Sequence, residues 1–283
     1  MSLPILLVIS FFLFRTPNFN GDSSFSCLEK QMNFGYRIPG SPAHKKCKNY
    51  IINRLRKTAD TVYLQNFEIN SVHFHNIIAE IHSKGKKWLL LGAHYDTRPF
   101  CDKDPDTTYQ DSALPGANDG ASGVAILLEL ARILYKKKPH VNIKFVFFDG
   151  EDFGRTEYSS FIGSKYFAST LIKKPDFAII VDMVGDRDLN IYKEGFSEQF
   201  SNGFNDRAFK IFKKLYPKNF IDSVKYYIDD DHIPLIKKGV SAIDIIDFDY
   251  PFWHTHLDTE DKCAPKSLEI TGRAIEQLTY ELR

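Results

Sequence analysis

The sequence has few cysteines, and none of them are paired at the spacing of a metal-binding motif. The four are Cys27, Cys47, Cys101 and Cys263, and no CxxC occurs in the 283 residues. A zinc ribbon is therefore excluded. Any metal that the chain binds must be held by carboxylates and histidines.

Neither sign of charge is in excess. Lys and Arg together number 37, and Asp and Glu number 36. This balance argues against a nucleic acid or an anionic membrane as the main partner. Hydrophobic residues make up 43% of the chain, which is enough for a full core and argues against disorder. The length is within the range of a single α/β domain.

The N-terminal apolar run is too short to span a bilayer, which needs about 20 residues. It extends from Leu3 to Phe14 and is followed by Arg15. We interpret residues 1–16 as a signal peptide or apolar leader and residues 17–283 as one catalytic domain, so we expect a secreted or periplasmic protein. No Lys or Arg precedes the run and no A-x-A site is evident, so a membrane-anchored, buried or interfacial segment is the alternative.

Export would place the chain in an oxidising compartment, where a disulfide between Cys27 and Cys47 becomes possible. Two free, buried thiols are the alternative. Once the leader is removed we expect no stable membrane span, and we expect a monomer.

Strand-like runs alternate with helical patterns along the chain. Strands are predicted at 61–69, 72–81, 88–93, 142–148, 177–184, 189–193 and 240–248, and helices at 20–33, 41–55, 122–136, 157–173, 196–216, 229–239 and 265–282. Asn70 and Ser71 lie between the first two strands and indicate a hairpin. The order predicts an α/β fold, a three-layer α/β/α sandwich around a central mixed, mostly parallel sheet with antiparallel strands at one edge.

Acidic residues and histidines follow the predicted core strands and the loops beside them. They are His94, Asp119, Glu151, Asp152, Asp182 and His254. Open α/β sheets bind ligands at the carboxyl ends of their strands. A lone aspartate there is more often a helix cap, but this whole set is not easily explained in that way. So many carboxylates would repel one another without a cation, and the histidines favour zinc over calcium or magnesium.

Glu151 and Asp152 are adjacent, and neighbouring side chains at a strand end point in different directions. One of them can therefore bind a metal while the other remains free as a general acid and base.

Five motifs in order resemble the zinc-dependent M28 peptidase superfamily: GAHYD, PGANDGASG, FFDGED, VDMVG and WHTHLD. The sequence is closer to the glutaminyl cyclases of that superfamily than to its aminopeptidases. Similarity to the bacterial cyclases is carried by HYDTRPFCDKDPD, GANDGASG, DGEDFG, DMVGD, YKEGFS and DDHIPLIKKGV. The resemblance extends from about Phe19 to the C-terminus.

The resemblance implies a role for each matching residue. Asp119, Asp152 and His254 match the zinc ligands, and Glu151 matches the general acid/base. Asp182 and Asp230 match two carboxylates that are hydrogen-bonded with that glutamate. Trp253 matches an indole that holds the substrate amide. His94 and Asp182 would bind a second metal in a two-zinc aminopeptidase. Asp152 replaces the glutamate of animal cyclases. Asp244 stands where those enzymes have a histidine, so no role is transferred to it.

Two assignments have alternatives. Trp253 could instead pack at an edge of the core, as buried aromatic residues usually do. His256 is a rival to His254 as a ligand, and only the resemblance favours His254.

The implied activity is that of a glutaminyl-peptide cyclotransferase, which converts the N-terminal glutamine of peptides or proteins to pyroglutamate and releases ammonia. One Zn²⁺ would polarise the γ-amide, and Glu151 would transfer the proton. A zinc aminopeptidase that hydrolyses the first peptide bond is the alternative. A non-catalytic peptide-binding protein is a third, and the intact Glu151 argues against it.

Overall fold

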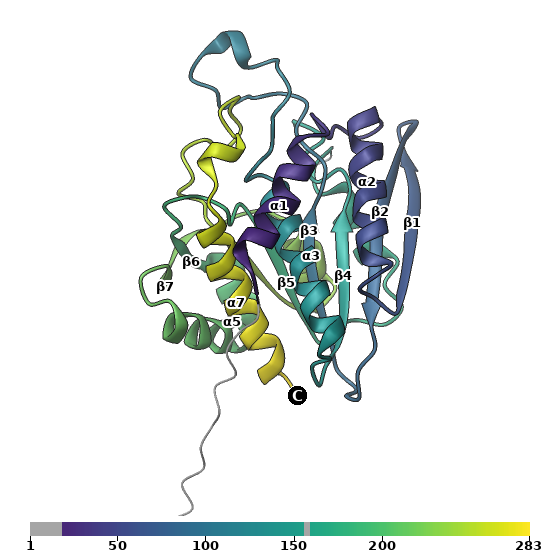
Figure 1. Ribbon diagram of the computed structural model, residues 1–283, viewed down its shortest axis with the longest axis vertical. Helices are drawn as coiled ribbons and strands as arrows, with labels where there is room; N and C mark the ends of the chain where they lie inside the picture. The colour runs from purple at the N-terminus through teal and green to yellow at the C-terminus, as the bar shows by residue number, and fades with distance from the viewer. Residues whose placement is uncertain (1–18, 156–158) are drawn as a thin grey trace, which may run out of the picture.

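The central sheet of the computed structural model, which describes residues 19–155 and 159–283, has six strands. They are β1 (Thr61–Ile69), β2 (Val72–Ile81), β3 (Trp88–His94), β4 (Asn142–Phe148), β5 (Phe177–Asp182) and β8 (Ser241–Ile246), in the spatial order β1-β2-β4-β3-β5-β8. The pairs β3–β4, β3–β5 and β5–β8 are parallel, whereas β1–β2 and β2–β4 are antiparallel. The predicted mixed sheet with an antiparallel edge is confirmed (Figure 1).

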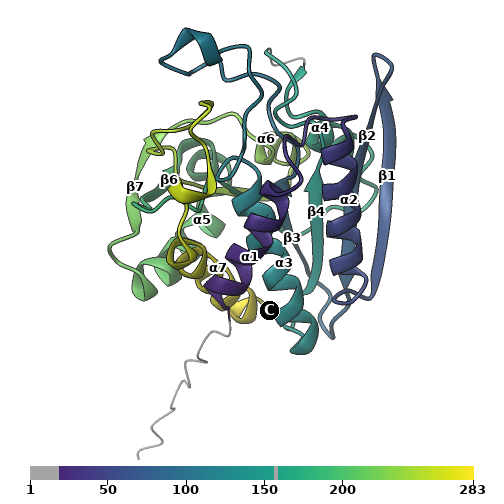
Figure 2. The ribbon, with the colours of Figure 1, turned by 45° about the horizontal axis from the view of Figure 1, so that its top comes forward.

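Helices cover both faces of this sheet. The helices α1 (Gly21–Met32), α2 (Pro42–Leu55), α3 (Ala121–Lys136), α5 (Gly195–Leu215) and α7 (Pro265–Glu281) contribute to one large apolar cluster, and α4 (Ile162–Ser169) and α6 (His232–Lys237) to a second. Alternation along β3 separates the two, because Leu89 and Leu91 join the first cluster and Leu90 the second. The three-layer α/β/α class is therefore confirmed, with α4 and α6 side by side (Figure 2).

Local signals account for several boundaries. Asn20 caps α1 by accepting the N–H of Ser23, and Ser41 caps α2 by accepting the N–H of His44, with Pro42 in the first turn. The predicted hairpin turn at Asn70 and Ser71 is confirmed, and both residues have positive φ angles, of 51° and 63°.

Several elements differ from the prediction. The strand expected to reach Val184 ends at Asp182, because Met183 adopts a left-handed conformation with φ 46°. In the described part of the expected helix 157–173, only α4 is helical, and residues 157 and 158 lie outside the described residues. A strand that we did not predict, β7 (Phe220–Tyr226), pairs in parallel with β6 (Ile191–Glu194) in a separate two-stranded sheet. Most of its side chains are exposed, so its sequence lacks an apolar run.

All four cysteines are buried and free, so the structure has two thiols rather than a disulfide at Cys27 and Cys47. The interpreted leader, residues 1–16, lies outside the described residues. Within 19–155 and 159–283, no helix combines the length and the apolarity needed to cross a membrane.

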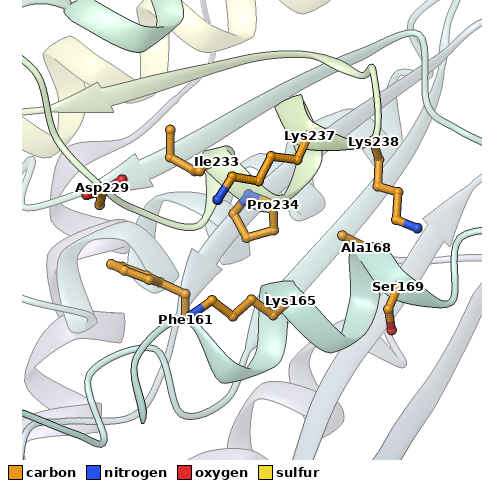
Figure 3. Close-up of a pocket in the computed structure, with 9 residues that line it drawn as sticks. All are labelled: Phe161, Lys165, Ala168, Ser169, Asp229, Ile233, Pro234, Lys237 and Lys238. Carbon is orange, nitrogen blue, oxygen red and sulfur yellow. The ribbon is translucent and has the colours of Figure 1, made fainter. Parts of the chain in front are cut away.

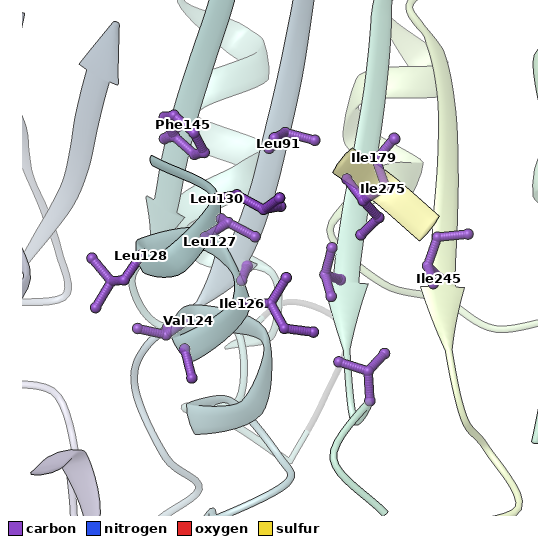
Figure 4. Close-up of a cluster of buried hydrophobic side chains, with 14 of the residues drawn as sticks. Leu91, Val124, Ile126, Leu127, Leu128, Leu130, Phe145, Ile179, Ile245 and Ile275 are labelled. Atoms are coloured by element: carbon purple, nitrogen blue, oxygen red, sulfur yellow. The ribbon is translucent and has the colours of Figure 1, made fainter. Parts of the chain in front are cut away.

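Helix α3 packs against the sheet as part of the largest apolar cluster. Leu127 on α3 is fully buried, in the same cluster as Leu91 of β3 and Phe145 of β4 (Figure 4). Replacing Leu127 with alanine should lower the free energy of unfolding by about 2–5 kcal/mol, since the cavity cannot close fully. Urea denaturation measures this loss. The control is Ile172→Ala at a fully exposed side chain, which should change stability by no more than about 0.5 kcal/mol. Equal effects in both variants would contradict this packing.

Candidate functional site

The carboxyl ends of the parallel strands bring the predicted site residues together. His94 is the last residue of β3, Glu151 and Asp152 follow β4, and Asp182 ends β5. Asp119 lies just before α3, and His254 lies in the loop after β8. Side chains from five separate segments therefore meet at one edge of the sheet, as the sequence predicted.

Three of these side chains form a compact, buried group of possible metal ligands. Atoms of Asp119, Asp152 and His254 all lie within 4.8 Å of one another. The Nε2 atom of His254 is 3.6 Å from Asp119 Oδ2 and 3.6 Å from Asp152 Oδ1. We call these three residues the ligand triad. Two carboxylates and an imidazole are a donor set that suits zinc.

A second group shares one residue with the ligand triad. The Nε2 atom of His94 lies 3.1 Å from Asp119 Oδ1 and 3.3 Å from Asp182 Oδ1. Asp119 thus faces both histidines. The geometry therefore places His94 and Asp182 where they could hold a second ion.

The electrostatics of the site fit a bound cation. Burial and the neighbouring Asp119 raise the pKa of Asp152 to about 7, and burial raises the pKa of Asp182 to about 6. Burial alone would lower the pKa of His94, but the surrounding carboxylates, that of Glu151 foremost, outweigh it and raise this pKa well above its ordinary value. The buried Oδ2 of Asp152 has no hydrogen-bond partner among the described residues. A positive ion at the ligand triad would balance these charges and satisfy this oxygen.

Two further carboxylates hold the loops that carry the ligands. The oxygens of Asp96 accept the N–H groups of Glu151 at 3.1 Å and Asp152 at 3.2 Å. Those of Asp258 accept the N–H groups of Asn118 at 2.9 Å and Asp119 at 3.1 Å. Such supporting contacts fix the direction of the ligands. Asp96 and Asp258 lie inside the quoted motifs, but the sequence alone does not distinguish a supporting carboxylate from a ligand.

Arg98 and Asp102 complete the surroundings of the ligand triad, and neither was predicted as a site residue. The Arg98 guanidinium contacts the carboxylate of Asp152 and donates to both oxygens of Asp102, at 2.9 and 3.1 Å. Asp102 Oδ1 also lies 3.2 Å from Nδ1 of His254. This arrangement directs Nε2 of His254 toward the two ligand carboxylates.

Unusual backbone conformations turn the ligands into the site. His254 has a φ of 55° and Gly120 a φ of 93°. A side chain at Gly120 would also meet the carbonyl oxygen of Asp96 at 2.9 Å and a ring carbon of His94 at 3.0 Å. Such strain is often found at functional sites. Only glycine fits at this position directly after Asp119.

A cavity of about 380 Å³ opens beside the ligand triad. Glu151, Asp182, Asp230 and Trp253 all line it. Burial raises the pKa of Glu151 well above its ordinary value, although the positive charge of His94 opposes this. A carboxyl group with a raised pKa at the cavity wall is suited to exchange protons near neutral pH.

Asp182 and Asp230 share this wall with Glu151, but in the described part of the chain no direct hydrogen bond joins their side chains to that of Glu151. Asp230 instead belongs to a buried polar cluster with His232 and Asp244, whose ligand atoms lie within 4.8 Å of one another. His232 Nε2 is 3.0 Å from Glu194, and Glu194 caps helix α5. The sequence assigned no function to Asp244 or Glu194.

Trp253 and His256, two rings near the site, have different neighbours. Trp253 is half-buried, stacks on His254 with ring centroids 4.1 Å apart, and lines the cavity. His256 instead pairs with Asp104 through Nδ1 at 2.5 Å and stacks on Tyr109. His254 rather than His256 therefore faces the ligand carboxylates.

The fold and the site together define an α/β protein with a candidate metal site at the carboxyl edge of its sheet. Residues 76–279, which make up most of the chain, match Peptidase family M28. The chain therefore belongs to this family, and the resemblance carried by its motifs is confirmed.

Relatives of known structure share the whole fold. The glutaminyl cyclase of Bacteroides thetaiotaomicron, solved bound to N-acetylhistamine, is 32% identical with a TM-score of 0.91, and the match covers 95% of this chain and 100% of that one. A Zn-dependent exopeptidase from Parabacteroides distasonis is 31% identical with a TM-score of 0.90, over 95% and 100% of the two chains. The glutaminyl-peptide cyclotransferase of Bos taurus is 25% identical over 87% of this chain and 78% of its own length.

Proposed function

We propose that this protein is a glutaminyl-peptide cyclotransferase, which converts an N-terminal glutamine to pyroglutamate and releases ammonia. The observation that carries the proposal is the partly buried Glu151 carboxyl group on the cavity wall beside the ligand triad. The names of the bovine and Bacteroides relatives support the same activity.

The ligand triad would hold one zinc ion. When bound, the ion would supply Lewis-acid polarisation of the γ-carboxamide carbonyl. Arg98 keeps Asp152 in place, and Asp102 does so for His254. Asp258 holds Asp119 by accepting the backbone N–H of Asp119. These contacts pre-organise the donor atoms.

Glu151 is the group that moves the proton. Its carboxylate takes a proton from the neutral α-amine of the substrate as the nitrogen attacks the γ-carbonyl carbon. A C–N bond forms and closes a five-membered ring, and the bond to the γ-amide nitrogen breaks. Glu151 returns the proton to that nitrogen, which leaves as ammonia. The nucleophile is tethered to its target, so proximity supplies much of the rate enhancement.

The indole of Trp253 would hold the side-chain amide of the substrate. Its ring is fixed between His254 and Phe248, at centroid distances of 4.1 and 5.0 Å. Asp182 and Asp230 would keep the wall around Glu151 negative, so that a cationic N-terminus is attracted to it.

Two structural expectations are part of this proposal. Residues 17–283 would act as a single catalytic domain and as a monomer. Residues 1–16 would direct export to the periplasm or the exterior, where peptides with N-terminal glutamine are the partners.

Peptide hydrolysis is the second candidate, because His94 and Asp182 could hold another ion beside Asp119. A related protein is described as a Zn-dependent exopeptidase. Two metals would favour activation of water, which an aminopeptidase needs.

Mass spectrometry of two peptides tests the proposal. Gln-Ala-Ala and Leu-Ala-Ala are incubated with purified protein, with and without a chelator. Cyclisation predicts the loss of one ammonia from the glutaminyl peptide only, and the chelator should stop it. Free leucine would establish the peptidase instead. If neither peptide changes, both enzyme activities are contradicted and a peptide-binding protein is favoured.

A further inference from the structure

A second groove adjoins the cavity of the candidate site. It has a volume of about 190 Å³ and shares two lining residues, Phe161 and Asp229, with the larger cavity. Figure 3 shows these two residues at one end of the groove and Ser169 and Lys238 at the other. A chain that leaves the larger cavity between Phe161 and Asp229 would therefore enter this groove.

The shared wall is tied to the catalytic loop. The backbone N–H of Phe161 donates to the carbonyl oxygen of Glu151 at 2.8 Å, and that of Ile162 donates to Gly150 at 3.1 Å. Phe161 is held with a φ of 55° just before helix α4. The groove is thus fixed in position relative to Glu151, as a subsite that extends an active site must be.

The lining of the groove combines apolar surface with positive charge. Its apolar lining residues are Phe161, Ala168, Ile233 and Pro234. Its charged lining residues are three lysines, Lys165, Lys237 and Lys238, and one acid, Asp229. In Figure 3 the ammonium groups of Lys165 and Lys237 point toward the end with Phe161, whereas that of Lys238 points away.

The two inward-pointing lysines differ in their contacts. Lys237 is exposed in the last turn of α6 and forms no ion pair with any residue that the structure describes. Lys165 donates to the carbonyl oxygen of Ser160 at 3.0 Å and lies over the Phe161 ring. The charge preference of the groove therefore depends on Lys237.

We propose that this groove binds the part of a peptide substrate that follows its N-terminal glutamine, and that it prefers an acidic side chain placed beside Lys237. The inference rests on the proposed function, because it assumes that the glutamine occupies the larger cavity. Charge complementarity and the shared Phe161 and Asp229 identify the occupant as an acidic peptide segment.

The test is a positional series of hexapeptides that begin with glutamine and are otherwise alanine. Glutamate or lysine is placed in turn at positions two to six, and kcat/KM is measured for each peptide. The wild-type protein should prefer glutamate over lysine by about fivefold at one of these positions, the size expected for an exposed ion pair. Salt at about 0.5 M should reduce the preference by screening.

Lys237→Glu should abolish or invert that preference, and Lys237→Gln should weaken it. The matched control is Lys136→Glu, since Lys136 is also an exposed lysine in the last turn of a helix, α3. This control should keep the wild-type preference, and turnover of Gln-Ala should stay unchanged in all variants. The proposed groove is overturned if the wild-type kcat/KM is the same for the glutamate and lysine peptides at every position. It is also overturned if Lys237→Glu and Lys136→Glu lose the preference equally.

Failure of the proposed function gives a separate result. If the wild-type protein cyclises none of the peptides, Gln-Ala included, the proposed activity is wrong. The groove is then judged by fluorescence anisotropy of the same hexapeptides labelled at the C-terminus. Tighter binding of a glutamate peptide that is lost in Lys237→Glu supports the groove, and equal binding of the glutamate and lysine peptides overturns it.

Discussion

Replacing Glu151 with glutamine should lower kcat for cyclisation of a glutaminyl peptide by about 10²–10⁴-fold. The amide has nearly the same shape as the carboxylate but can neither take up nor return the proton. The side chain sits on the cavity wall, and Asp96 accepts the backbone N–H of this residue. The loop geometry does not depend on the side-chain charge, so the variant should fold and bind peptide normally.

Steady-state kinetics and calorimetric peptide binding check this prediction together. Glu260→Gln is the control, because Glu260 is an exposed glutamate in the short turn Glu260–Lys262 and should leave both quantities unchanged. A Glu151→Gln enzyme within tenfold of wild-type kcat would assign the proton transfer to another group. Loss of peptide binding along with activity would point to a structural role for the carboxylate.

The strands could be predicted because buried strands appear in the sequence as continuous apolar runs. Strand β4 begins and ends at the predicted residues, Asn142 and Phe148. Parallel strands place their carboxyl ends at one edge, so the meeting of His94, Asp182 and Glu151 followed from topology alone. In contrast, β7 exposes most of its residues and left no such pattern.

The candidate metal ligands were predicted from the sequence, but the residues that hold those ligands in place were not. A carboxylate that accepts backbone N–H groups, as Asp258 does, has the same local sequence as one that binds metal. The pairing of Arg98 with Asp152 depends on how the loop 98–114 folds back over the site, and that loop has no periodicity from which to derive a path. The role of Glu194 depends on contacts between distant segments, among them His232 and helix α5.

Removal of the metal should abolish activity, and added zinc should restore it. The direct reason is the chemistry of the ligand triad, where Asp119, Asp152 and His254 converge in a buried position. Asp119→Asn should weaken zinc binding by more than about 100-fold, since even changes behind the ligands cost 10–100-fold. Zinc content by mass spectrometry under native conditions and turnover of Gln-Ala-Ala measure the two losses.

The same experiment decides the number of ions. Asp119 belongs to both possible metal groups, whereas Asp182 belongs only to the one with His94. We expect one zinc per wild-type chain, because Nε2 of His94 lies 3.1 and 3.3 Å from the carboxylates of Asp119 and Asp182, close enough to pair with both without a second ion. Asp182→Asn should therefore keep one zinc while Asp119→Asn loses it. Two ions in the wild type and one in Asp182→Asn would contradict the single-ion site, and would favour hydrolysis of the first peptide bond, since a second ion can activate water.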